Sequence, residues 1–196
     1  PLADALQMPA SGLQALVDDA AARLPWLRCT GATAFEGRLI AARYAFGHTI
    51  YRRVLYERVP AAQRLHWHRQ WAAALAALHG PAAGEIAAEL ALHFERGDAP
   101  SAAAQQLATV AARALARGAG REAVHAARRA LQLGQRTIER TLELELRVLE
   151  AVALTRLHVI SEPEVAAAFE RARALGAVES PAWPHARHGS WWVHFV

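Results

Sequence analysis

Apolar residues recur at helical spacing throughout the second half of the chain, with small residues at the positions where two helices would cross. Two groups of residues follow this pattern, and each group spans two predicted helices separated by a short connection. The first group is Leu107, Val110, Ala111 and Ala114, followed by Ala123, Ala127 and Ala130. The second is Leu149, Val152 and Ala153, followed by Val165, Phe169 and Ala172. Because small side chains allow close contact between helices, the pattern predicts closely packed helical pairs.

The offsets within each group are those of a tetratricopeptide repeat, and the sequence GAG at 118–120 supplies a turn. The groups are 42 residues apart, counted from Ala123 to Val165, which is longer than the standard 34-residue repeat. A third group starts at WPHARHGSWWVHFV (183–196), with Gly189 at the small position, and the sequence stops before its second helix. We therefore expect tetratricopeptide-like repeats over 101–196, truncated at the C-terminus.

The first residues of the chain predict helices followed by a short β-hairpin. Ser11 can cap a helix, and two short strands follow at 26–31 and 38–46. This order is that of a winged helix-turn-helix, and we assign a winged-helix-like unit to residues 1–59. Residues 60–100 are then predicted to form bridging helices. The expected fold is mostly α, with a winged-helix-like unit containing a small β-hairpin, followed by tetratricopeptide-like α-helical repeats.

Two amphipathic helices are predicted after the hairpin. From Thr49, one helix face carries Ile50, Tyr51, Val54 and Leu55, and the other carries Arg52, Arg53 and Tyr56. The next helix runs to His79 with a stripe of Trp67, Trp71, Leu75 and Leu78, which predicts packing against other helices. His48 stands just before the first of these helices, where a histidine can cap it.

The composition excludes several classes of function. All 22 cations are arginine, and without lysine the phosphate-binding loop G-x-x-x-x-G-K-[ST] cannot form. No nucleophile elbow or paired-carboxylate motif is visible, so we do not expect this segment to be an enzyme. The single cysteine, Cys29, permits no internal disulfide or cysteine-based zinc site, and on a predicted strand it is expected to be a packed thiol. These features favour a cytoplasmic protein.

Neither a membrane nor a metal is an expected partner. No apolar run approaches the roughly 18 residues that cross a bilayer, and Pro1 is not a start methionine, which suggests a fragment. His66 and His68 would point about 200° apart on a helix, so they cannot form a pair of ligands on one face. His185 and His188 are better spaced, but they lie in the truncated tail, and a metal site is not expected there either.

Three stretches carry a resemblance to a known family. They are ARYAFGHTIYRRVLYERVPAAQRLHWHRQWAAALAALHG, GEIAAELALHFERGD and AARALARGAGREAVHAARRAL. Together they resemble the region after the ATPase core in bacterial STAND-type signal-transduction ATPases, which are AAA-like. In that family the core is typically fused to a LuxR-type or winged-helix transcription-factor domain, or to adenylate or guanylate cyclase domains. PEVAAAFERARAL extends the resemblance through the repeats.

The resemblance implies a regulatory and protein-interaction role. It implies that an upstream P-loop module in the same chain binds ATP or ADP with Mg²⁺, while this segment holds no cofactor itself. The repeats would receive a protein or a small effector, and the output would be transcription or cyclase activity. His48 is then the candidate nucleotide-sensing residue, and Arg52 and Arg53 are candidate phosphate or partner contacts. The chain departs from the family at Gly47, where a basic residue is common, and at Arg53, where Glu is common.

Two alternatives remain open. The first is a DNA-binding winged-helix transcriptional regulator, although the presumed reading helix SGLQALVDDAAARL offers Asp18, Asp19 and only Arg23. Carboxylates in that position repel phosphate, so nucleic acid is not an expected partner of this segment. The second alternative is a helical-repeat scaffold without any coupling to nucleotide.

Overall fold

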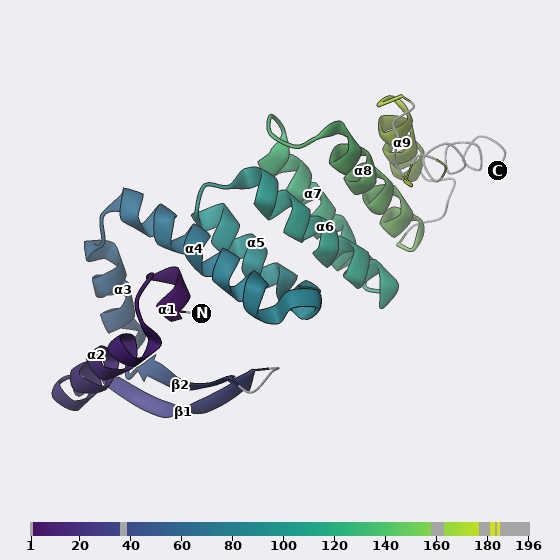
Figure 1. Ribbon diagram of the computed structural model, residues 1–196. Helices are drawn as coiled ribbons and strands as arrows, with labels where there is room; N and C mark the ends of the chain where they lie inside the picture. The colour runs from purple at the N-terminus through teal and green to yellow at the C-terminus, as the bar shows by residue number, and fades with distance from the viewer. Residues whose placement is uncertain (1, 36–38, 158–162, 177–180, 183, 185–196) are drawn as a thin grey trace. The chain divides into compact units, whose positions relative to one another are not determined.

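The computed structural model describes residues 2–35, 39–157, 163–176, 181–182 and 184. Within these residues the chain is mostly helical, with a small two-stranded antiparallel sheet (Figure 1). This coarse prediction is confirmed, whereas the winged-helix-like and tetratricopeptide-like assignments remain predictions. The chain divides into two compact units: unit 1 is 1–83 with 96–98, and unit 2 is 84–95 with 99–196. The division lies inside the 60–100 stretch that the sequence suggested as a bridge.

Unit 1 contains the hairpin and the helices around it. Its elements are α1 (Leu2–Ala5), α2 (Ala10–Arg23), β1 (Leu27–Phe35), β2 (Leu39–Phe46), α3 (Thr49–Arg58) and α4 (Ala61–His79). The sequence predicted Ser11 as the cap of α2. This prediction is wrong, because the helix begins at Ala10, before Ser11. Pro9 occupies the N-cap position with φ −58°, and no side chain caps the helix. The proline ring fixes that torsion angle and so starts the helix.

The hairpin is longer than the predicted strands. Leu27 lies opposite Phe46, and Cys29 lies opposite Tyr44. The pairing register shifts between Cys29 and Gly31, and the strands then stay paired up to Phe35 and Leu39. Gly31 has a φ of +127°, which side chains rarely tolerate. Glycine therefore allows the irregularity, and the first strand extends to Phe35, beyond its predicted end at residue 31.

The core of unit 1 is small. Among the residues whose burial the structure describes, Ala5, Ala72 and Leu75 are its buried apolar ones, and α1 packs against α4. Leu75 confirms part of the predicted stripe on α4, but Trp67 is 37% exposed. Helix α3 contains no buried residue, so its predicted apolar face remains largely exposed. That face meets few neighbours within the described residues because α3 follows the hairpin directly and touches mainly β2.

Unit 2 is a series of helices in which sequence neighbours pack together. After the 3-10 helix η1 (Gly80–Ile86), which crosses the boundary, they are α5 (Ala87–Arg96), α6 (Pro100–Ala116), α7 (Gly120–Gly134), α8 (Arg140–Thr155) and α9 (Pro163–Arg173). Helix α6 packs on α7, α7 on α8, and α8 on α9 (Figure 1). Gly118, with a φ of +80°, turns the chain between α6 and α7, as the GAG sequence predicted.

The predicted crossing positions form the core of unit 2. Most of them are fully buried, namely Ala111, Ala114, Ala123, Ala127, Ala130, Ala153, Val165 and Ala172. Helices α6 and α7 contribute nearly all of one apolar cluster, and α7, α8 and α9 contribute most of another. The small residues therefore do what their spacing predicted. The third group, including Gly189, lies almost entirely outside the described residues.

Candidate functional site

His48 caps helix α3. Its backbone is extended, with φ −148° and ψ 143°, and its Nδ1 accepts a hydrogen bond of 3.2 Å from the backbone N–H of Ile50. This confirms the interpretation of His48 as a cap. Because Nδ1 acts as the acceptor, the proton of the neutral ring is on Nε2. The exposed His48 thus keeps one N–H donor for a group outside the helix.

Arg52 and Arg53 are about 100° apart around α3 and have different surroundings. Arg52 follows His48 by four residues, so the two occupy neighbouring positions on one side of the helix, about 40° apart. Arg53 points elsewhere, and its Nε donates to Glu57 Oε1 at 2.8 Å. That hydrogen bond, together with the charge of Glu57, raises the pKa of Arg53. A ligand at His48 could therefore meet Arg52, whereas Arg53 already has a partner.

An aromatic stack holds the start of α3 against the hairpin. The Trp26 ring lies 6.0 Å from the Phe46 ring and 5.4 Å from the Tyr51 ring, and both pairs are nearly parallel. The backbone N–H of Gly47 also donates to the carbonyl of Trp26, at 2.6 Å. This role of Trp26 could not be predicted from the sequence, because its partners are at least 20 residues away along the chain.

The end of α3 contacts α4 through polar and aromatic groups. The Tyr56 hydroxyl and His68 Nε2 share a hydrogen bond of 2.9 Å, and the Arg64 guanidinium lies 5.0 Å from the centre of the Tyr56 ring. His68 is thus engaged with Tyr56. No group of three potential metal ligands occurs within the described part of the chain, which excludes His185 and His188. Cys29 is exposed, so the prediction that it is a packed thiol is wrong.

The acidic residues of α2 are occupied by contacts within unit 1. The Tyr44 hydroxyl on β2 donates to Asp18, and the Gln14 amide donates to the same carboxylate at 2.9 Å. The Tyr44 hydrogen bond is the main reason that the pKa of Asp18 is lowered and that of Tyr44 is raised. Asp19 pairs with Arg23 at 2.7 Å. Arg23, the cation of the helix that would read DNA, is therefore already paired with a carboxylate.

Replacing Tyr44 with phenylalanine should raise the pKa of Asp18 toward its ordinary value of about 3.9. In the folded wild type the pKa of Asp18 is depressed, so its contribution to stability is present above that ordinary value and is lost as pH falls through the folded pKa. An NMR titration of the Asp18 side-chain carboxyl carbon measures the shift. The titration of Asp18 in the wild type is the reference, and an unchanged Asp18 titration in the variant would contradict the assignment.

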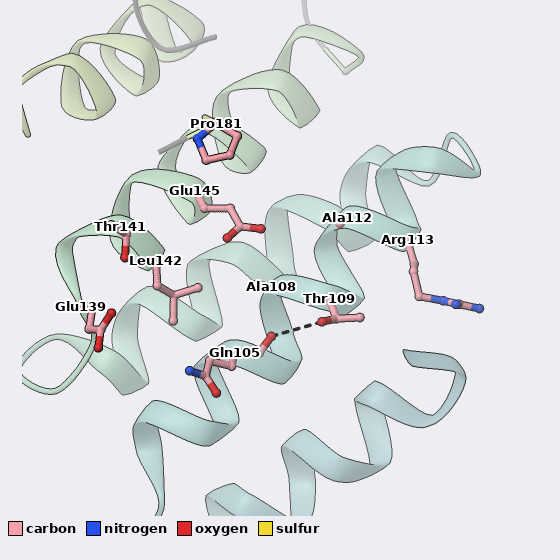
Figure 2. Close-up of a pocket in the computed structure, with 10 residues that line it drawn as sticks. All are labelled: Gln105, Ala108, Thr109, Ala112, Arg113, Glu139, Thr141, Leu142, Glu145 and Pro181. Atoms are coloured by element: carbon pink, nitrogen blue, oxygen red, sulfur yellow. Dashed lines mark hydrogen bonds between the residues drawn. The ribbon is translucent and has the colours of Figure 1, made fainter. Parts of the chain in front are cut away.

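A cleft opens between α6 and α8 in unit 2. Its volume is about 540 Å³ (Figure 2). The lining residues are Gln105, Ala108, Thr109, Ala112, Arg113, Glu139, Thr141, Leu142, Glu145 and Pro181. Small apolar side chains form part of the wall, while amide, hydroxyl and carboxylate groups provide hydrogen-bonding capacity. The sequence did not indicate this site, since its polar residues look like ordinary exposed positions on two separate helices.

A buried carboxylate lies where α7, α8 and α9 meet. The side chain of Glu150 is only 4% exposed, and its Oε1 accepts from Arg128 Nε at 2.8 Å. Arg128 also pairs with Glu164 at 2.7 Å, and Arg171 approaches Glu150 Oε1 to 3.6 Å. The hydrogen bond to Glu150, followed by the one to Glu164, raises the pKa of Arg128. Glu150 Oε2 has no hydrogen-bond partner among the described residues. This network joins helices of both predicted repeat pairs.

Comparison of the chain with protein families, curated proteins and solved structures found no match. Among the helices described, none is long and apolar enough to cross a membrane.

Proposed function

We propose that this chain is a regulatory, protein-interaction region of a STAND-type signal-transduction ATPase. In this proposal an upstream P-loop module in the same protein holds ATP or ADP with Mg²⁺, and unit 1 responds to its nucleotide state. Unit 2 receives a protein or small effector, and the output is transcriptional or cyclase activity. The region itself carries out no catalytic step.

The observation that carries the proposal is the order of the two units. A small unit of helices and a hairpin is followed directly by helices that pack through buried alanines, such as Ala111 and Ala127. Arrays of paired helices offer extended surfaces for partners. The exposed apolar side chains of α3, such as Ile50 and Val54, also suit contact with another domain.

Two substitutions at His48 test the nucleotide-coupled role. Asparagine can still cap α3 through its Oδ1, but its amide N–H groups lie closer to the backbone than Nε2–H does, whereas alanine provides neither a cap nor a donor. If Nε2–H contacts a phosphate of ADP, both variants should bind ADP at least about tenfold more weakly, since a hydrogen bond to a charged group is lost. Only the alanine variant should also destabilise α3, by about 1 kcal/mol. Calorimetric titration of the protein made from the complete reading frame measures the ADP affinity.

His66→Asn is the control, because His66 is exposed on α4 and away from the start of α3. Unchanged ADP affinity in His48→Asn would contradict nucleotide sensing by this residue. A lysine-bearing phosphate loop in the few hundred residues before Pro1 would support the ATPase assignment. Its absence would favour the helical scaffold without nucleotide coupling. The DNA-binding alternative has less support, since Arg23 is paired with Asp19.

A further inference from the structure

The cleft between α6 and α8 has two walls of different chemistry. Figure 2 shows Glu145 and Leu142 projecting from α8 toward α6, and Gln105 projecting from α6 toward α8. Thr109 uses its hydroxyl proton on the backbone carbonyl of Gln105, at 3.4 Å, so its oxygen faces the cleft mainly as an acceptor. The Glu145 carboxylate on α8 and the Gln105 amide oxygen on α6 therefore offer acceptors to a ligand in the cleft.

The carboxylates of the cleft differ from most others in unit 2. Most glutamates of these helices are paired with arginines, namely Glu95, Glu122, Glu143, Glu150, Glu164 and Glu170. The side chains of Glu139 and Glu145 have no ion pair or hydrogen bond to any described residue. Although Glu139 is the N-cap residue of α8, its side chain does not cap the helix. Both carboxylates are exposed and free to accept from a ligand.

Arg113 does not neutralise these carboxylates. It lines the opposite end of the cleft, and Figure 2 shows it pointing away from Glu139 and Glu145. The part of the cleft between Gln105 and α8 thus carries two uncompensated negative charges beside apolar carbon from Ala108 and Leu142. A long basic side chain matches both features, because its methylene groups cover apolar surface while its head group reaches carboxylates.

We propose that this cleft binds an extended segment of a partner protein through an arginine or lysine side chain, with Glu145 accepting from its cationic head group and Glu139 adding to the negative charge of the cleft. The cleft volume lies within the range of ordinary ligand sites, and the cleft is open, so a chain can enter and leave it. The inference rests on the proposed role of unit 2 in receiving a partner. It does not depend on coupling to a nucleotide.

An NMR titration of the ¹⁵N-labelled 196-residue chain tests this inference. The probe is the heptapeptide Ser-Ala-Ala-Arg-Ala-Ala-Ser with blocked ends, and the matched probe has citrulline, which is neutral and of similar shape, in place of arginine. The arginine peptide should shift the backbone amide signals of Gln105, Thr109 and Leu142, and the citrulline peptide should bind at least about tenfold more weakly. Raising the salt concentration should weaken the binding of the arginine peptide only, because salt screens its charge.

The double variant Glu139→Gln/Glu145→Gln should lower the affinity for the arginine peptide about tenfold, to the level of the citrulline peptide. Glu85→Gln/Glu89→Gln changes the net charge equally at two exposed glutamates outside the cleft, and should leave the affinity unchanged. Equal binding of the two peptides, or equal weakening in both double variants, would overturn the inference. The peptide comparison on the wild type stands even if a variant does not fold. None of these outcomes alters the ADP measurement, so the proposed function and this inference can fail separately.

Discussion

Replacing Arg128 with methionine is expected to lower the free energy of unfolding of unit 2 by about 3 kcal/mol. The substitution removes the hydrogen bond to Glu150, whose side chain is only 4% exposed, and leaves Arg171 at 3.6 Å as its remaining cation. A buried carboxylate without a close partner is costly because water cannot solvate it. Urea unfolding followed by helical circular dichroism measures the loss, and the melting temperature should fall by about 6–12 °C.

The neighbouring arginine provides the control. Arg129 pairs with Glu95, whose side chain is 35% exposed, so Arg129→Met should cost only about 0.2–1 kcal/mol. The double variant Arg128→Met/Glu150→Met should recover most of the stability, since an apolar pair of similar volume needs no buried charge. Equal losses in Arg128→Met and Arg129→Met would contradict the idea that burial of Glu150 makes its partner important.

The Arg128 network marks a limit of what this sequence reveals. Arginine and glutamate alternate along much of the chain, so nothing in the sequence distinguishes Glu150 from an exposed glutamate. Glu150 is buried because α7 and α9 both pack on α8, and its partners Arg128 and Arg171 are 22 and 21 residues away in sequence. The cleft could not be predicted from the sequence for the same reason, because its lining side chains come from α6 and α8 and meet only in the folded chain.

Periodicity was informative where helices pack on both sides and misleading where they do not. In unit 2 the small residues are buried as their spacing predicted, because each helix has a neighbour to receive them. In α3 the same kind of stripe is exposed, with Ile50 at 55% and Val54 at 44%. An amphipathic pattern shows that a helix has an apolar face, but it does not say whether this chain supplies the surface that covers it.

Replacing Ala127 with leucine is expected to destabilise unit 2 by about 3 kcal/mol. Ala127 is fully buried in α7, in a cluster with small residues of α6 that include Ala104 and Ala111. A leucine adds three carbon atoms where two helices meet closely, so the helices must separate or the side chain must adopt a strained rotamer. Urea unfolding measures the loss, and the backbone amides of α6 and α7 should exchange hydrogen faster.

Ala116→Leu is the matched control, because Ala116 is an exposed residue at the end of α6. The same added volume there should change stability by no more than about 0.5 kcal/mol. If Ala127→Leu lowers the free energy of unfolding strongly and Ala116→Leu does not, close contact between helices, rather than helix propensity, explains the alanines of this unit. If both variants unfold at the same urea concentration, the alanines do not determine the spacing of α6 and α7. The repeat-like offsets would then reflect composition alone.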